Sequence, residues 1–227
     1  MTSLSVLIVV NNEEKQLREC LRTISFADEI VIILDKCTDR SKSIAKKFTK
    51  KIFSGAWKIE GDSFSSLNSL KKSVIITAPH THWVDFYLGI LIRGALDFKS
   101  SYLAKKELFI FPLSVFLKWT GGVPVNRSSN NNLVSQIASI YAENKEFRLS
   151  LAPEGTRKRV KKFKSGFYYI AIEAKVPIVM LSMDYMNKKT IISEPFYPTG
   201  NKKSDFDYIE NFFDGVIGKI KEYSFYK

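Results

Sequence analysis

The residues of this chain that could do acid–base chemistry gather in one short stretch. Residues 80–85 read His-Thr-His-Trp-Val-Asp and contain both histidines of the 227-residue sequence. The stretch follows the apolar run 74–78 and Pro79, and it precedes a helical pattern over 86–96. A histidine held by an aspartate is the minimal apparatus for taking a proton off a hydroxyl. The pattern therefore predicts a His/Asp general-base pair on a strand-to-helix loop.

Three further motifs stand at predicted strands. They read Gly-Gly-Val-Pro-Val-Asn-Arg over 121–127, Glu-Gly-Thr-Arg over 154–157 and Val-Pro-Ile over 176–178. A strongly basic run continues from Arg157 to Lys164. Three interpretations of this run stay open: a solvated face, a contact for lipid headgroups or CoA phosphates, and a nucleic-acid patch.

The elements that must hold these motifs alternate between strand and helix, which is typical of an α/β fold. The first fifty-odd residues predict a β-α-β-α-β half-unit of a nucleotide-binding fold. Its predicted elements are a strand over 4–10, a helix over 13–24, a strand over 29–34, a helix over 41–48 and a strand near 51–53. Beyond residue 72 the predicted strands are 73–78, 101–104, 148–152, 176–181 and 190–192, and the predicted helices are 86–96, 131–143, 166–174 and 205–223.

The charge balance favours partners that carry phosphate. Lys and Arg number 35 against 23 Asp and Glu, giving a net charge of +12. Such a balance fits nucleic acid, anionic lipid or phosphorylated substrates. With 17 phenylalanines, the chain could rest on an anionic membrane surface, or it could be a basic protein with a Phe-rich core.

No stretch predicts a membrane span or a secretory signal. The mean hydropathy is −0.09, and no uncharged apolar run approaches the roughly 18–20 residues of a transmembrane helix. The longest candidate, 108–117, is about half that length and contains Pro112. Residues 1–10 carry no basic region. The two cysteines, Cys20 and Cys37, match no zinc pattern and are expected to be reduced thiols.

The N-terminal residues 3–53 resemble the opening of an inverting family 2 glycosyltransferase of GT-A fold. The resemblance rests on Ser-Val-Leu-Ile-Val-Val-Asn-Asn-Glu-Glu over 5–14, Ala-Asp-Glu-Ile-Val over 27–31 and Leu-Asp-Lys-Cys-Thr-Asp-Arg-Ser over 34–41. It implies a nucleotide contact at Asp35. The family's metal-binding Asp-x-Asp after a strand does not follow, since Asp205-Phe-Asp207 lies in a helical pattern. We therefore expect residues 1–54 to be a truncated glycosyltransferase-like segment.

Residues 56–227 resemble the glycerolipid acyltransferase family, which includes the 1-acylglycerol-3-phosphate acyltransferases. The four motifs occur in the family's order, and Ala-Lys-Lys-Glu-Leu over 104–108 and Phe-Tyr-Pro-Thr-Gly over 196–200 look like its compact bacterial members. The resemblance implies an acyltransferase domain over 55–227. It also implies a glycerol-phosphate-acyltransferase-like mixed sheet flanked by helices, within an overall α/β fold.

The resemblance assigns the general base to His80, because the family spacing reaches Asp85 five residues on. Asp85 would fix the imidazole tautomer and stabilise the imidazolium as it forms. His82 is the alternative base. No enzyme nucleophile is required, because the acceptor alcohol is itself the nucleophile.

The resemblance assigns acceptor binding to two further motifs. Arg157 would clamp a phosphate with Thr156 and backbone N–H groups, Gly155 would allow close approach, and Glu154 would orient Arg157 or the acceptor hydroxyl. Arg127 would be a second phosphate clamp, beside Asn126 where many members have aspartate. The alternative is that both arginines are surface ion-pair residues. Val-Pro-Ile over 176–178 would serve packing.

The expected function is transfer of a fatty acyl group from acyl-CoA or acyl-carrier protein to the hydroxyl of a lysophospholipid or glycerol-phosphate-type acceptor. No metal and no bound cofactor are expected; the acyl donor is a co-substrate. The expected location is peripheral, on an anionic membrane surface at the cytoplasmic face of the inner membrane, without a nucleic-acid partner. Two alternatives stay open: a nucleotide-sugar glycosyltransferase, and a non-catalytic membrane-surface binding module.

Overall fold

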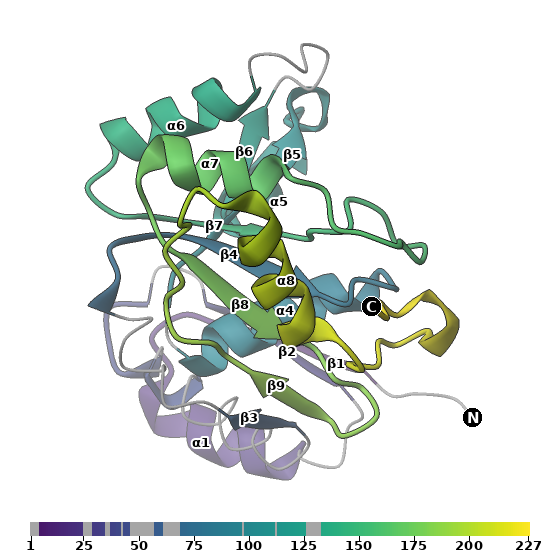
Figure 1. Cartoon of the computed structure of the whole chain (residues 1–227). Helices are drawn as coiled ribbons and strands as arrows, with labels where there is room; N and C mark the ends of the chain where they lie inside the picture. Colours follow the sequence, from purple (N-terminus) through teal and green to yellow (C-terminus); the bar gives the residue numbers. More distant parts are fainter. Residues whose placement is uncertain are drawn as a thin grey trace. The chain divides into compact units, whose positions relative to one another are not determined.

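The computed structural model (Figure 1) describes two compact units of the chain, Met1–Ala56 and Trp57–Lys227. The described residues are 5–24, 29–34, 37–41, 43–45, 57–60, 69–96, 98–111, 113–125 and 133–227.

The first unit contains a β-α-β arrangement. Strands β1 (Ser5–Val10) and β2 (Glu29–Leu34) pair in parallel, and helix α1 (Glu14–Thr23) connects them. The helix forms because its apolar residues recur on one side, and Leu17 and Leu21 are buried there in a small core. These elements agree with the sequence pattern. The predicted third strand near 51–53 and the predicted nucleotide contact Asp35 lie outside the described residues.

The loops after β1 and β2 hold each other by hydrogen bonds. The Asn12 side-chain oxygen accepts from the backbone N–H of Thr38 at 2.7 Å and of Asp39 at 3.2 Å. Glu14 and Arg40 form an ion pair at 3.3 Å between Oε2 and Nε. The polar motif residues of this unit therefore pair with one another at the carboxyl ends of the two strands.

The second unit is built on a five-stranded sheet with the strand order β6-β5-β7-β4-β8. The strands are β4 (Lys72–Ala78), β5 (Ser101–Lys105), β6 (Gly122–Val125), β7 (Phe147–Leu151) and β8 (Ile178–Ser182). Every named pair is parallel, with Val74 opposite both Leu149 and Ile178. The predicted α/β fold with flanking helices is confirmed. Antiparallel pairing in this region is limited to isolated bridges such as Ile178 to Phe196.

Helices cover both faces of this sheet. They are α4 (Val84–Leu96), α5 (Leu113–Trp119), α6 (Leu133–Glu143), α7 (Gly166–Ala174) and α8 (Lys202–Phe213). Figure 1 shows α7 and α8 in front of the sheet and α4 behind it. Successive side chains of β4 point to opposite faces of the sheet. Val74 and Ile76 join the core with α6, α7 and α8. Ile75 and Thr77 face a cavity that α4 also lines.

The connections on the α4 side run in one direction across the sheet. From β4 the chain passes through α4 to β5, and from β5 through α5 to β6. Because such crossovers are right-handed, α4 and α5 cover the same face. The connections from β6 to β7 and from β7 to β8 run the opposite way, so α6 and α7 cover the other face.

The neighbouring strands β4 and β7 therefore send the chain to opposite faces of the sheet. The chain after β4 enters α4, whereas the chain after β7 leads to α7. Where adjacent parallel strands diverge in this way, a crevice opens at their carboxyl ends. The His80 loop and the 152–165 loop lie at that crevice.

A second, two-stranded parallel sheet was not predicted. Strand β3 (Lys58–Glu60) pairs with β9 (Lys189–Ile191), and the Trp57 indole N–H donates to the Thr190 hydroxyl at 3.0 Å. Strand β9 corresponds to the strand predicted over 190–192, whereas β3 was not predicted. The pairing of β3 with β9 joins segments far apart in the sequence, which no short pattern encodes. The pairing joins the start of this unit to the chain after β8.

The helix predicted over 205–223 is wrong at its C-terminal end. Helix α8 begins at Lys202 and ends at Phe213, because Asp214 is extended and Gly215 follows with φ of +75°. Apolar residues continue beyond Phe213, so the hydrophobic pattern does not indicate where the helix ends. The chain then folds back, and the Ile220 backbone N–H donates to the Thr81 hydroxyl at 3.0 Å.

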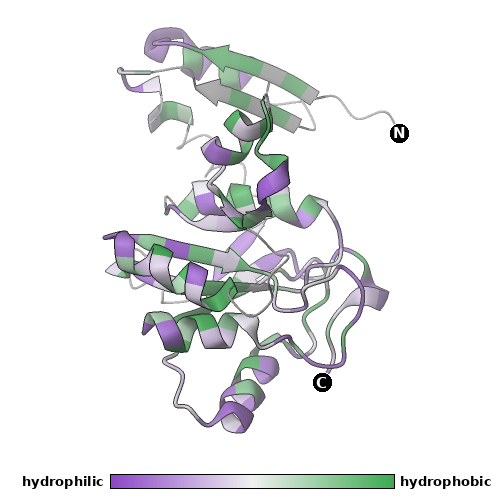
Figure 2. Ribbon diagram, turned by 90° about the horizontal axis from the view of Figure 1, so that it is seen from above, coloured by the Kyte–Doolittle hydropathy of each residue, from purple (hydrophilic) through white to green (hydrophobic). Residues whose placement is uncertain are grey.

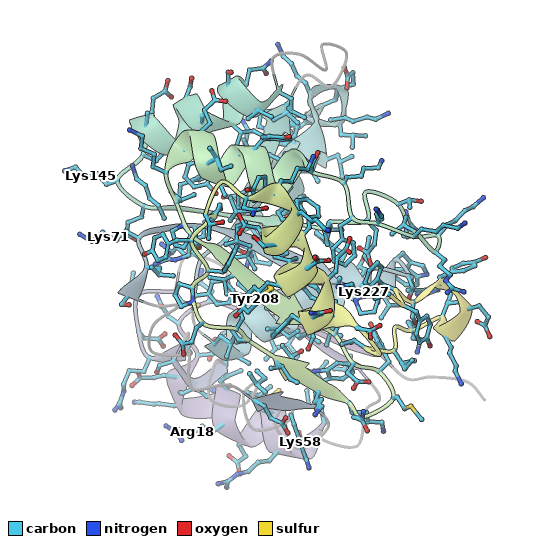
Figure 3. The ribbon with its side chains drawn as sticks, viewed as in Figure 1. Arg18, Lys58, Lys71, Lys145, Tyr208 and Lys227 are labelled. Atoms are coloured by element: carbon cyan, nitrogen blue, oxygen red, sulfur yellow. The ribbon has the colours of Figure 1, made fainter. Side chains whose placement is uncertain are left out.

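The helices carry alternating hydrophilic and hydrophobic bands (Figure 2), as expected for elements with one packed face. Two basic side chains of the second unit illustrate its charged surface. Lys71 and Lys145 are exposed and point away from the second unit (Figure 3). Arg148, by contrast, is buried in β7.

Candidate active site

The predicted His/Asp pair lies at the carboxyl end of the central strand β4. The Nδ1 atom of His80 is 3.2 Å from Oδ2 of Asp85. The His80 side chain is 30% exposed, whereas that of Asp85 is 1% exposed. With Nδ1 engaged by Asp85, Nε2 is the nitrogen left to exchange a proton with a bound hydroxyl. The arrangement has the geometry of a base oriented by a buried carboxylate.

The Asp85 carboxylate is held from several directions. Its Oδ2 atom accepts the backbone N–H of Thr81 at 2.7 Å and of His82 at 2.8 Å, and its Oδ1 atom accepts the Tyr185 hydroxyl at 2.7 Å. Burial raises the pKa of Asp85, but hydrogen bonds from His80, His82, Tyr185 and Thr81 outweigh it and hold the pKa below its usual range. Asp85 therefore stays ionised beside His80.

The second histidine makes a different contact. The Nδ1 atom of His82 accepts the backbone N–H of Val84 at 3.3 Å, and its ring lies against Trp83 with 5.5 Å between centroids. Only its Nε2 atom is left for other partners. His80, unlike His82, is among the residues that line the cavity described below.

Glu154 joins the two loops of the crevice. Its Oε1 atom accepts the backbone N–H of His80 at 2.9 Å. Its Oε2 atom is buried and has no hydrogen-bond partner among the residues that the structure describes. Burial raises the pKa of Glu154 to about 7, despite the opposing hydrogen bond from His80. Glu154 thus contacts the His80 backbone in this structure, and its expected role of orienting Arg157 or the acceptor hydroxyl stays a prediction.

The remaining residues of the Glu-Gly-Thr-Arg motif lie at the edge of the crevice. Gly155 has φ of +62°, a left-handed conformation that favours glycine, and a Cβ atom there would also displace the flexible end of the Lys164 side chain, 2.8 Å away. The Thr156 hydroxyl accepts the backbone N–H of Lys158 at 3.3 Å. Arg157 is exposed. The predicted second clamp, Arg127, and its neighbour Asn126 lie outside the described residues.

A cavity of about 830 Å³ extends from these loops between α4 and the sheet. Its lining includes His80, Asp85 and Arg157 together with cationic Lys164. Apolar side chains from both layers line much of the rest: Ile75, Phe86, Ile90, Ile92, Phe98, Leu103, Leu151, Leu181 and Met183. The arrangement can hold a long apolar group whose polar end lies near His80 and two cations.

Two residues of this region were missed in the sequence. Tyr185 follows β8 and reaches Asp85, one hundred residues earlier. Its place directly after a parallel strand was the available signal, since such positions gather at one edge of the sheet. Arg93 lines the cavity and donates from Nη1 to the carbonyls of Ser100 at 2.7 Å and Thr120 at 2.8 Å. Its position inside a helical pattern gave no signal.

Comparison with known proteins gives the class. Residues 57–184 match the sequence profile described as Acyltransferase. This match covers more than half of the chain, and the chain belongs to the acyltransferase family.

Two curated relatives bear the name 1-acyl-sn-glycerol-3-phosphate acyltransferase. The Salmonella typhimurium protein is 33% identical over 93 residues, which cover 38% of this chain and 38% of that protein. The Cocos nucifera protein is 29% identical over 129 residues, which cover 53% of this chain and 39% of that protein. The chain thus spans well under half the length of the curated relatives it matches.

A solved structure shares the fold. The 1-acyl-sn-glycerophosphate (LPA) acyltransferase PlsC from Thermotoga maritima aligns with a TM-score of 0.52. The alignment covers 86% of this chain and 84% of that chain at 20% sequence identity. The likeness supports the fold described above.

The described residues contain neither a metal-holding cluster nor a membrane-spanning helix. No group of three or more His, Cys, Asp or Glu side chains among them could hold a metal ion. None of the helices in the described part of the chain is long and apolar enough to pass through a bilayer.

The raised pKa of Glu154 predicts a specific pH dependence of stability. The folded protein keeps a proton that the unfolded chain releases between about pH 4.5 and about pH 7. This contribution is full below that window and is lost as the pH rises through it, by roughly 3 kcal/mol. Glu154→Gln has no carboxyl group to titrate at this position. As the pH rises from about 4.5 to about 7, we expect the unfolding free energy of Glu154→Gln, measured by urea denaturation, to increase relative to that of the wild type.

The exposed Glu143→Gln is the matched control, and its difference from the wild type should stay nearly constant. If Glu154→Gln also kept a constant difference from the wild type between those pH values, Glu154 would not be a neutral buried acid.

Proposed function

We propose that the chain is an O-acyltransferase that moves a fatty acyl group from a thioester, acyl-CoA or acyl-carrier protein, to the hydroxyl of a lysophospholipid or glycerol-phosphate-type acceptor. The observation that carries the proposal is the His80–Asp85 pair at 3.2 Å, lining a cavity of about 830 Å³ together with apolar side chains and the cations Arg157 and Lys164. Membership of the acyltransferase family supports it.

The proposed reaction needs one proton acceptor and no enzyme nucleophile. Nε2 of His80 takes the proton of the acceptor hydroxyl as its oxygen bonds to the thioester carbonyl carbon. The tetrahedral oxyanion then collapses, the C–S bond breaks, and the thiolate leaves. The imidazolium returns the proton to the leaving sulfur. Asp85, ionised and buried, stabilises the imidazolium between these steps.

The cavity supports the choice of an acyl donor. Its apolar lining removes a hydrocarbon chain from water, and each buried methylene contributes about 0.8 kcal/mol. Phe86 and Ile90 of α4 and Leu103 of β5 belong to this lining. The hydrocarbon chain of the acyl donor would extend into the cavity, and the thioester carbonyl of the donor would lie beside His80.

The cations of the cavity support an acceptor that carries phosphate. Arg157 presents a planar guanidinium, which matches phosphate oxygens in pairs. Lys164 lies beside Gly155 and adds a second positive charge. We propose that these two side chains orient the acceptor so that its hydroxyl meets His80, with Thr156 and, from outside the described residues, Arg127 as further phosphate contacts.

An anionic membrane surface is the proposed location of this chemistry. Large apolar side chains are exposed on the face covered by α4 and α5, in the α4 region and in the segment 108–119. They are Trp83, Tyr87, Leu91, Leu108, Ile110, Phe111, Leu113, Val115 and Trp119. Lys105 and Lys106, just before this segment, and Lys118 within it are exposed. Apolar contact and attraction to anionic headgroups together give peripheral binding.

The side of the membrane follows from the donor. Acyl-CoA and acyl-carrier protein are cytoplasmic molecules, so we propose the cytoplasmic face of a bacterial inner membrane. The remaining alternatives, a nucleotide-sugar glycosyltransferase and a non-catalytic membrane-binding module, predict no release of thiol from acyl-CoA that depends on both the acceptor and His80.

Loss of the base should nearly abolish acyl transfer. We expect His80→Ala to lower kcat/KM by about 10²–10⁴-fold, because proton removal from the acceptor then depends on water. The measurement is acceptor-dependent thiol release from palmitoyl-CoA, with lysophosphatidate and extracted membrane lipids as acceptors. His82→Ala is the control and should keep its activity. Full activity in His80→Ala with loss in His82→Ala would assign the base to His82.

Loss of the Arg157 guanidinium should weaken binding of an acceptor that carries phosphate. We expect Arg157→Ala to raise KM for lysophosphatidate by about tenfold or more, because a charged hydrogen bond contributes roughly 1.5–3 kcal/mol. The KM of Arg157→Lys for lysophosphatidate should lie between those of the wild type and Arg157→Ala, since lysine keeps the positive charge but lacks the planar guanidinium. Lys145 is exposed and lies just before β7, whereas Arg157 follows that strand, so Lys145→Ala should leave KM unchanged. An equal rise in KM for monoacylglycerol, which lacks phosphate, would contradict the assignment.

The exposed apolar segment should govern vesicle binding. We expect the double substitution Ile110→Ser and Phe111→Ser to weaken cosedimentation with phosphatidylglycerol vesicles by about tenfold or more, because two large side chains no longer enter the bilayer. Ile172→Ser, on α7 and the other face, is the matched control. Binding of the wild type should weaken with salt. If the Ile110/Phe111 double variant bound vesicles as well as Ile172→Ser does, the membrane contact would lie elsewhere.

A further inference from the structure

The Asp85 carboxylate has a donor that none of the four motifs contains. The Tyr185 hydroxyl donates to Oδ1 of Asp85 at 2.7 Å. The other oxygen, Oδ2, accepts the backbone N–H groups of Thr81 and His82 and lies 3.2 Å from Nδ1 of His80. Among the described residues Tyr185 provides the hydrogen bond to Oδ1. The two oxygens thus have separate partners.

We propose that Tyr185 is a positioning residue for the His80–Asp85 pair, a role that rests on the proposed acyl transfer. The backbone N–H groups of Thr81 and His82 hold Oδ2 toward His80, and the Tyr185 hydroxyl engages the other oxygen, Oδ1. Tyr185 therefore acts on the imidazole through Asp85. Its hydroxyl takes up part of the negative charge that Asp85 presents to His80.

The Tyr185 ring is itself held firmly, which a positioning role requires. Its backbone N–H donates to the carbonyl of Ile217 at 2.8 Å. The Trp57 ring meets it edge-on with 5.1 Å between centroids, and Nζ of Lys219 lies 5.7 Å from the ring centre. These contacts involve the backbone and the ring rather than the hydroxyl. Phenylalanine would therefore keep the packing and lose only the donor.

The hydroxyl stays a donor at all working pH values. Burial raises the pKa of Tyr185, and the neighbouring Asp85 raises it further. Its removal leaves the full charge of Asp85 facing His80, while the two backbone N–H groups still hold Oδ2 in place. The imidazolium form of His80 then becomes more favourable, so proton release from His80 moves to higher pH.

The first test needs no substrate. The chain has only two histidines, so the imidazole signals in NMR can be assigned with His82→Gln. We expect the His80 signals to titrate at a pH higher by roughly half a unit in Tyr185→Phe than in the wild type. Tyr208→Phe, which removes a hydroxyl from the half-exposed face of α8 (Figure 3), should titrate as the wild type does. An unchanged or lower midpoint in Tyr185→Phe overturns the proposal.

The second test separates positioning from packing by the pH profile. In palmitoyl-CoA and lysophosphatidate assays, the acid limb of kcat/KM should move up with the same half unit in Tyr185→Phe, giving about threefold lower rates on that limb. Tyr185→Leu, which also removes the ring, should show the same shift together with a lower thermal midpoint. A rate loss in Tyr185→Phe that is equal at every pH would make the role structural and overturn the proposal.

The two proposals fail in different ways. If His80→Ala retains acyl transfer, the proposed function fails, while the NMR result still decides whether Tyr185 controls the His80–Asp85 pair. If His80→Ala is inactive and Tyr185→Phe matches the wild type in both tests, the function stands and the positioning role is wrong.

Discussion

A buried carboxylate is the constraint on which the site depends. An ionised group that is 1% exposed is tolerated only when hydrogen bonds replace its lost hydration. Asp85 obtains them from its own loop, through the N–H groups of Thr81 and His82, and from Tyr185 after β8. Meeting this need brings two strand ends together and leaves His80 with a fixed partner. Order at the site is therefore a consequence of solvating one charge.

The sheet provides the place where this can happen. Strands β4 and β7 are neighbours whose chains depart to opposite faces, so a crevice opens between their carboxyl ends. Glu154 spans that space with its hydrogen bond to the His80 backbone at 2.9 Å. The apolar layer between α4 and the sheet stays partly unfilled and forms the cavity. One topological divergence thus sets the base, the cations and the cavity beside one another.

Local features of the chain were predictable and distant pairings were not. Strand β2 and helix α7 agree with the sequence at both ends, because apolar runs and boundary residues act over a few positions. Motif spacing paired His80 with Asp85, which the structure places in the first turn of α4. Tyr185 was missed because its bond to Asp85 depends on the order of β4 and β8 in the sheet, which no short pattern encodes. The stop of α8 at Phe213 was missed because apolar residues continue past it.

The fold-back after α8 has a consequence for how substitutions far from the base can act on it. The Ile220 N–H donates to the Thr81 hydroxyl, and Gly218 lies so close to the same side chain that a Cβ atom there would be 2.6 Å away. The loop that carries His80 is thus supported by a segment 139 residues further along the sequence. A larger residue at position 218 would displace Thr81 and disturb this loop without touching the His80–Asp85 pair itself.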